Sequence, residues 1–172
     1  MADLSKIWAE LGIPADYAVK RGLPLQPEAA ELISVGADNQ NRDCRLAPEA
    51  AQAWRAMRDA ASKEGITLQL VSGFRSIERQ AELIRRKLAR GICLEEILRS
   101  NAAPGYSEHH TGRALDLTDG VVAPLSESFG ETQAFAWLSH HATHFGFHLS
   151  YSRNTPLGIV YEPWHWCWRE PA

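Results

Sequence analysis

Residues 113–118 (RALDLT) place an acidic side chain inside a stretch that otherwise has the pattern of a buried strand. In an extended chain, Leu115 and Leu117 point toward the core, while Ala114 and Asp116 share the other face. A carboxylate in such a strand is costly to bury unless it has a partner. The fold must therefore give Asp116 a metal ion, an arginine or a turn that it caps.

The decapeptide SEHHTGRALD, residues 107–116, contains a histidine seven positions before Asp116. Thr111 and Gly112 favour a turn between the two residues. If the chain turns there and then runs as a strand, His109 and Asp116 can bind one metal ion. This segment alone does not decide whether Asp116 is a ligand.

A second polar segment, EPWHW at residues 162–166, contains Glu162 and His165 three positions apart at a strand end. On its own, this pattern is typical of a core-edge histidine and an ordinary surface glutamate. Together with His109 and Asp116, it provides two imidazoles, one carboxylate ligand and one spare carboxylate. Catalytic zinc sites commonly use three protein ligands and leave a position for water, on which a carboxylate acts as base.

Arg75, in SGFRS at residues 72–76, directly follows a predicted buried strand, at an end where side chains often reach a cleft. A guanidinium there can stabilise the oxyanion of a tetrahedral intermediate. It can equally bind a terminal carboxylate through paired hydrogen bonds. The alternative is a surface arginine that pairs with Glu78 or Glu108, and the sequence leaves these interpretations open.

Four histidines crowd another region, and two of them, His140 and His144, have the spacing of a helical zinc site. The helical zinc-protease motif needs a glutamate directly after the first histidine. His141 occupies that position here. We therefore interpret this cluster, which also includes His148, as helix-face and strand histidines.

The apolar periodicity predicts an α+β fold with a small, mainly antiparallel sheet and flanking helices. We expect the zinc site to lie in a cleft over this sheet. Residues 36–45 are polar and rich in Asn and Asp, which predicts a loop. We expect helices over residues 3–12, 48–65, 77–90, 94–100 and 131–144, strands over 66–74 and 113–118, and a final hairpin from 145–151 and 158–162.

The length of 172 residues suits one domain. A net charge of −3 without a basic run argues against a nucleic-acid partner. The first thirty residues contain no apolar stretch long enough for a signal peptide or a membrane span. We therefore expect a cytoplasmic protein without a membrane span; if an export segment was removed, the alternative is a periplasmic protein. We also expect a monomer.

The segments SGFRSIERQ, PGYSEHHTGRALDL, FGFHLSY and EPWHW occur in the order seen in VanY-type D-alanyl-D-alanine carboxypeptidases. The chain resembles this family of zinc peptidoglycan peptidases, which are related to VanX and to the hedgehog zinc domain, over residues 48–168. The resemblance implies one zinc ion, Glu162 as general base, and Arg75 as the arginine that acts on substrate and transition state. It places Ser107 and Gln80 near the terminal carboxylate of the substrate. The implied zinc ligands are His109, Asp116 and His165.

Three positions depart from the family pattern. Phe74 replaces a common tyrosine, His110 replaces a frequent glutamine, and Cys167 stands where arginine often follows the last aromatic residue. Residues 1–47 show no usable resemblance. We expect them to form an extension packed on a single peptidase domain that spans residues 1–172, with 48–168 as its core.

The resemblance implies removal of a terminal D-alanine from peptidoglycan stem peptides or their precursors, by default as a D,D-carboxypeptidase. An L,D-carboxypeptidase acting on tetrapeptides in peptidoglycan recycling would suit a cytoplasmic protein better. A non-catalytic zinc-binding module is the alternative of another class, but it would need neither Glu162 nor Arg75. An endopeptidase that cuts inside the stem peptide would share the same metal ligands.

Overall fold

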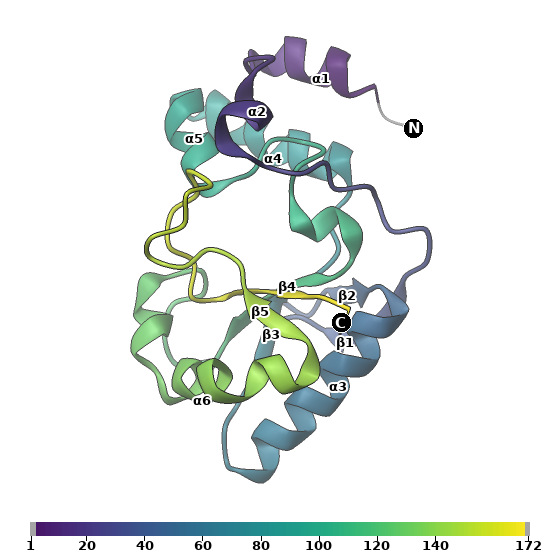
Figure 1. Cartoon of the computed structure of the whole chain (residues 1–172), viewed down its shortest axis with the longest axis vertical. Helices are drawn as coiled ribbons and strands as arrows, with labels where there is room; N and C mark the ends of the chain where they lie inside the picture. Colours follow the sequence, from purple (N-terminus) through teal and green to yellow (C-terminus); the bar gives the residue numbers. More distant parts are fainter. Residues whose placement is uncertain (1–2, 171–172) are drawn as a thin grey trace.

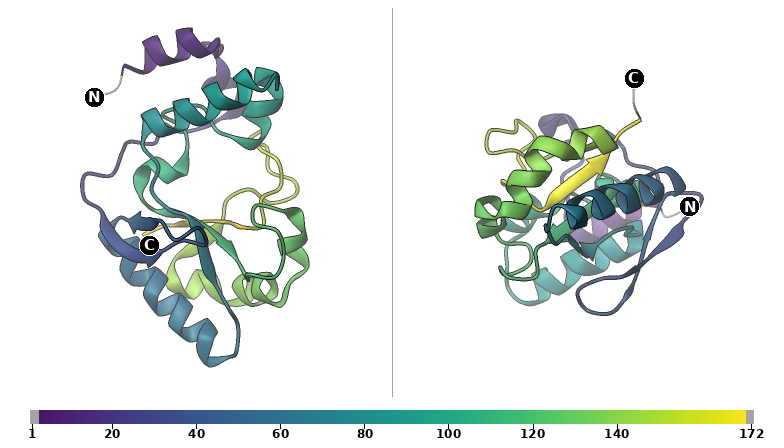
Figure 2. Two further views of the ribbon diagram at one scale, coloured as in Figure 1. Left: turned by 180° about the vertical axis from the view of Figure 1, so that it is seen from behind. Right: turned by 90° about the horizontal axis from the view of Figure 1, so that it is seen from below.

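A four-stranded antiparallel sheet lies at the centre of the protein, which is described here by a computed structural model over residues 3–170. Its strand order is β3-β4-β6-β5, and neighbouring strands are antiparallel throughout. Helices α3 and α6 lie on one side of the sheet, and α4 and α5 lie on the other side, with α1 and α2 beyond them (Figures 1 and 2). The predicted α+β fold is thus confirmed. The strands are β3 (Gln69–Ser72), β4 (Ala114–Thr118), β5 (Phe147–Leu149) and β6 (His165–Trp168).

The register of the sheet brings the polar residues of three strands together. Asp116 of β4 lies opposite Ser72 of β3 on one side and opposite His165 of β6 on the other. Leu115 and Leu117 are fully buried in the main core, as their alternation with Asp116 predicts. Truncating either leucine to alanine should cost about 2–5 kcal/mol.

The main core is formed by the sheet with α3 (Pro48–Lys63) and α6 (Gln133–His141). α3 begins with a proline at its first position, where no backbone donor is needed. Its buried side chains include Trp54 and Met57, which recur at helical spacing on the face toward the sheet. The larger of the two hydrophobic clusters therefore joins the sheet to α3 and α6.

A second hydrophobic cluster joins the N-terminal helices to the other side of the molecule. α1 (Leu4–Leu11) and α2 (Tyr17–Arg21) pack there with α4 (Ile77–Ala89) and α5 (Leu94–Ser100). Trp8 donates a hydrogen bond of 2.9 Å to the carbonyl of Pro104, just before the segment that contains His109. Ser76 caps the start of α4, where its hydroxyl accepts from the backbone N–H of Arg79 at 3.1 Å. The N-terminal helices thus support the wall of the cleft that α4 and α5 form.

Two secondary-structure predictions are wrong. Residues 36–45, expected as a loop, belong to a hairpin of β1 (Ile33–Ala37) and β2 (Asp43–Leu46). The polar residues lie mainly at its turn, where the Asp38 carboxylate accepts from the backbone N–H groups of Gln40 and Arg42.

The second error concerns the final hairpin. β5 pairs with β6 and not with residues 158–162, which form no strand. The backbone N–H groups of Val160 and Glu162 instead donate to the carbonyls of Arg99 and Tyr151, two separate parts of the chain. These bonds anchor the segment that presents Glu162. Among the described residues, no helix is long and apolar enough to span a membrane.

Candidate active site

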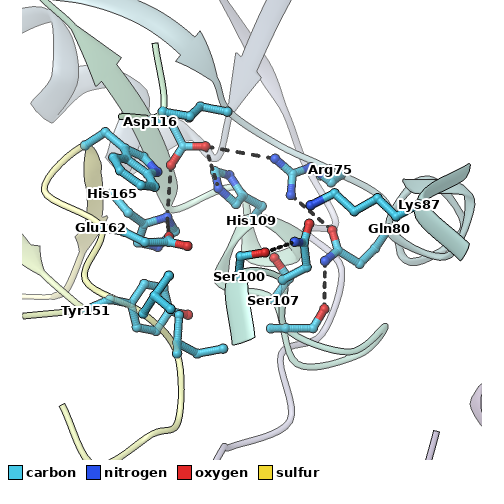
Figure 3. A pocket seen from close by; sticks show the side chains of 16 residues that line it. Arg75, Gln80, Lys87, Ser100, Ser107, His109, Asp116, Tyr151, Glu162 and His165 are labelled. Carbon is cyan, nitrogen blue, oxygen red and sulfur yellow. Dashed lines mark hydrogen bonds and ion pairs between the residues drawn. The ribbon is translucent and has the colours of Figure 1, made fainter. Parts of the chain in front are cut away.

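His109, Asp116 and His165 converge at one point of the sheet (Figure 3). The 3-10 turn Glu108–Thr111 supplies His109, while β4 and β6 supply the other two. The carboxylate oxygens of Asp116 lie 3.2 Å from His109 Nε2 and 3.0 Å from His165 Nδ1. The three side chains are buried, and their donor atoms lie within 4.8 Å of one another.

Each imidazole is oriented by a hydrogen bond on the nitrogen that faces away from Asp116. His109 Nδ1 donates to the carbonyl of Gly73 at 2.7 Å, and His165 Nε2 donates to Glu108 Oε2 at 2.9 Å. The Glu108 carboxylate also accepts from the hydroxyl of Ser150 at 2.6 Å. Such outer partners fix the tautomer of a metal-ligating histidine. They leave His109 Nε2 and His165 Nδ1 directed at the same point.

The close contacts among Asp116, His165 and Glu108 shift the pKa values of all three side chains. Burial alone would raise the pKa of Asp116, but His109 and His165 hold it far below its usual range. Burial lowers the pKa of His165, but Asp116 and Glu108 outweigh it and raise the value to about 10. The pKa of Glu108 falls to about 2 despite its burial, because His165 is its hydrogen-bond partner. The carboxylates of Asp116 and Glu108 therefore favour positive charge on the side chain between them, His165.

This donor set fits zinc. Two imidazole nitrogens and one carboxylate are typical of three-ligand catalytic zinc sites. A divalent cation here would satisfy the buried carboxylate that the sequence placed in a strand, and it would take the place of the proton on His165 Nδ1. Of the partners considered for Asp116, an arginine also lies near, because Arg75 Nη2 is 4.0 Å from its carboxylate.

Glu162 lies beside this cluster without binding in it. Its Oε2 is 4.0 Å from His165 Nδ1, and the side chain lines a cavity of about 310 Å³ that also contains the three candidate ligands. Burial raises the pKa of Glu162 to about 7, against the influence of His165. A carboxylate with a pKa near neutrality is suited to accept a proton and return it.

Arg75 enters the same cavity and is held by hydrogen bonds. Its Nη1 donates to Gln80 Oε1 and its Nη2 to Ser72 Oγ, both at 3.0 Å. The side chain is 19% exposed, and neither Glu78 nor Glu108 is its partner. The alternative of a surface arginine paired with either glutamate is therefore wrong.

The two remaining predicted site residues, Gln80 and Ser107, differ in whether their polar groups already have hydrogen-bond partners. Gln80 is fully buried, and both ends of its amide are engaged, since Nε2 donates to the carbonyl of Ala102 at 2.7 Å. It lines the cavity mainly as the residue that positions Arg75. Ser107 is buried at the cavity wall, and its hydroxyl has no hydrogen-bond partner among residues 3–170.

The other histidines are outside the cluster. His110 is fully buried, with Nδ1 donating to the Arg75 carbonyl at 2.6 Å and Nε2 accepting from the Gly105 N–H at 3.1 Å. Both its nitrogens are thus used by the backbone. His140 bonds to a carbonyl of its own helix, and no histidine of residues 140–148 joins a potential metal group in the described part of the chain.

Sequence reasoning missed Glu108 as the partner of His165. Its position directly before His109 suggested only a surface ion pair. The signal was indirect, because a histidine that ligates through Nδ1 needs an acceptor for its other nitrogen. Which acceptor reaches it depends on the turn that carries Glu108 toward β6, and spacing along the chain does not reveal that contact.

Comparison with known proteins agrees with this geometry. The family model VanY, D-alanyl-D-alanine carboxypeptidase, matches residues 43–171. The chain is 38% identical over 121 residues to the putative carboxypeptidase YodJ of Bacillus subtilis, which covers 68% of this chain and 44% of that protein. The chain thus spans less than half the length of this relative.

Two solved structures extend the comparison. The LD-carboxypeptidase LdcB is 31% identical with a TM-score of 0.73, covering 84% of this chain and 71% of that one. A vancomycin resistance D,D-pentapeptidase VanY in complex with Zn(II) is 26% identical with a TM-score of 0.65, covering 85% and 82%. The matched family model covers all three candidate zinc ligands together with Glu162 and Arg75. The chain belongs to the VanY family of D-alanyl-D-alanine carboxypeptidases.

Proposed function

We propose that this protein is a zinc-dependent carboxypeptidase that removes the terminal D-alanine from peptidoglycan stem peptides or their precursors, acting as a D,D-carboxypeptidase. The single observation that carries the proposal is the shared cavity. It brings the three candidate ligands, the buried carboxylate of Glu162 and the guanidinium of Arg75 to one point. A base and an oxyanion-stabilising cation beside a metal site form a hydrolytic arrangement.

The roles follow from position. Zinc, when bound by His109, Asp116 and His165, supplies Lewis acidity for the scissile carbonyl and acidifies water. Glu162 takes the proton from the attacking water and delivers it to the leaving amine, for which a pKa near neutrality is favourable. Arg75 faces the oxygen on which negative charge develops, with its guanidinium held in place by Gln80 and Ser72 before the substrate arrives.

A non-catalytic zinc-binding module is less consistent with this arrangement. Burying Glu162 beside Asp116 and Glu108 raises its pKa, which is a cost to the folded state if its carboxylate is ionised. A binding module gains nothing from that cost. A base beside the metal does, because its proton affinity is what the reaction requires.

L,D-cleavage of tetrapeptides is the second candidate. The observation in its favour is that LdcB, a neighbour with a TM-score of 0.73, is named an LD-carboxypeptidase. Both reactions use the same metal ligands, base and arginine, and they differ in the configuration of the residue before the scissile bond. Cytoplasmic location and a monomeric state stay predictions.

Mass spectrometry of products tests the proposal and separates the two candidates. The zinc-loaded protein is incubated with stem pentapeptide and stem tetrapeptide, with Glu162→Gln as the inactive control. Loss of one alanine from the pentapeptide supports D,D-cleavage, and loss from the tetrapeptide alone would transfer the proposal to L,D-cleavage. Intact peptides after prolonged incubation with protein of verified zinc content would refute both.

A further inference from the structure

Lys87 extends from α4 into the active-site cavity on the side away from Glu162 and His165 (Figure 3). It lies seven residues after Gln80, so both side chains project from the same face of the helix. Lys87 is half-buried, and its ammonium has no hydrogen bond or ion pair among residues 3–170. Burial and the positive charge of Arg75 lower its pKa. Two cations thus share one wall with no anion between them.

Arg75 can serve only one part of a bound peptide. The guanidinium of Arg75 lies 4.0 Å from Asp116, beside the candidate zinc ligands, where the scissile carbonyl must sit. The carboxylate at the end of the peptide belongs to the next residue, whose Cα is about 3.8 Å further along the chain. A cation committed to the oxyanion cannot neutralise that carboxylate at the same time.

Gln80 and Ser107, which the resemblance places near the terminal carboxylate of the substrate, carry no positive charge to neutralise it. Gln80 uses its amide to hold Arg75 and the Ala102 carbonyl, and Ser107 offers one neutral hydroxyl. A carboxylate that leaves water for a partly enclosed cavity needs a charged partner as well as a hydrogen bond. Of the two cations that line this cavity, Arg75 and Lys87, only Lys87 has no hydrogen-bond or ion-pair partner among residues 3–170.

We propose that Lys87, together with the hydroxyl of Ser107, binds the free carboxylate at the C-terminus of the peptide substrate and thereby sets the specificity for cleavage at the last residue. This inference rests on the proposed function. It concerns a residue other than the candidate metal ligands, the base and the oxyanion arginine. The ligand class is a peptide with an unblocked terminal α-carboxylate.

Because the cleft is open at one end, its shape alone does not restrict cleavage to the last residue of a peptide. Lys87 and Asn101 line the active-site cavity and also an adjoining groove of about 560 Å³ that continues toward β2 and the turn before it. The cleft is therefore open at this end, and a longer peptide could enter the groove. The attraction of Lys87 for a terminal carboxylate, rather than a steric wall, restricts cleavage to the last residue.

Turnover of three matched peptides tests the assignment: the free acid, its C-terminal amide, and the peptide extended by one glycine. With the zinc-loaded protein, the free acid should be the best substrate. Lys87→Met keeps the apolar stem and removes the charge. It should lower kcat/KM for the free acid about 10- to 100-fold, mainly through KM, and leave the other two peptides nearly unchanged. Arg86→Gln, an exposed neighbour on the same helix, should keep the preference for the free acid.

Binding measured by calorimetry on the zinc-loaded Glu162→Gln protein, with and without Lys87→Met, separates this inference from the proposed function. If the free acid binds more tightly than the amide only when Lys87 is present, the carboxylate site stands even where no peptide is cleaved. Equal binding of acid and amide overturns it. Equal turnover of all three peptides, or an equal loss on all three in Lys87→Met, also overturns the assignment while hydrolysis itself remains.

Discussion

Replacing Arg75 by lysine keeps the positive charge in the cavity but removes the planar group that two hydrogen bonds hold beside Asp116. A lysine ammonium can satisfy at most one of these contacts from the same backbone position. Its charge would then lie away from the developing oxyanion. We expect kcat/KM to fall by the contribution of one oxyanion donor, about 2.7–4 kcal/mol, or about 10²–10³-fold.

The same contacts limit the effect on stability. Arg75 makes two partly buried side-chain hydrogen bonds, each contributing about 0.5–1.5 kcal/mol. If lysine retains one of them, the free energy of unfolding should fall by about 1 kcal/mol. For a chain of 172 residues this corresponds to a decrease in Tm of about 2–4 °C. Zinc content should be unchanged, because Arg75 supplies no ligand atom.

Three measurements on one preparation decide the matter: kcat/KM on the cleaved stem peptide, zinc by elemental analysis, and Tm. Arg79→Lys is the matched control, since Arg79 is near in sequence but pairs with Glu82 at a half-exposed position. An unchanged kcat/KM in Arg75→Lys would show that another cation stabilises the transition state. A decrease in Tm well beyond that of two hydrogen bonds would mean that Arg75 is mainly structural.

Three further changes probe the base, the metal and the outer contact of His165. Glu162→Gln should keep zinc and lose about 10²–10⁴ in turnover; near-normal turnover in a peptide assay would exclude it as the base. His109→Ala should lose zinc while His144→Ala keeps it, as measured by elemental analysis, and the reverse would contradict the ligand assignment. Glu108→Ala leaves His165 Nε2 without its acceptor in a buried position, so the free energy of unfolding in urea should fall by about 1–3 kcal/mol, whereas an unchanged value would show that the contact does not stabilise the fold.

Much of the fold follows from local periodicity. The helices α3 and α4 were predicted within two residues of their observed ends, because each has a continuous apolar face and a clear start. The alternation in β4 likewise predicted which face is buried. The β1–β2 hairpin was missed because its strands are short, and its polar residues gather at a turn that Asp38 organises.

The convergence of the three candidate ligands was predictable because it depends on residue types and on a single turn. His109, Asp116 and His165 differ from their apolar neighbours, and the spacing allows them to meet. The partners around them depend on contacts between distant segments. The bond from His165 to Glu108 and the position of Lys87 in the cavity both arise from how β6 and α4 pack in three dimensions. Local sequence patterns do not predict such contacts.

The candidate zinc ligand His109 and Arg75 are held together by backbone contacts, although more than thirty residues separate them in the sequence. Three hydrogen bonds connect the two segments: His109 Nδ1 donates to the Gly73 carbonyl, the Arg75 N–H donates to the His109 carbonyl, and His110 Nδ1 donates to the Arg75 carbonyl. A displacement of the turn that carries His109 therefore displaces the backbone of Arg75 as well. His110 suits this task because an imidazole nitrogen can donate to a carbonyl. The distance between Arg75 and the candidate ligand His109 is thus set by the backbone of two short segments rather than by a flexible side chain alone.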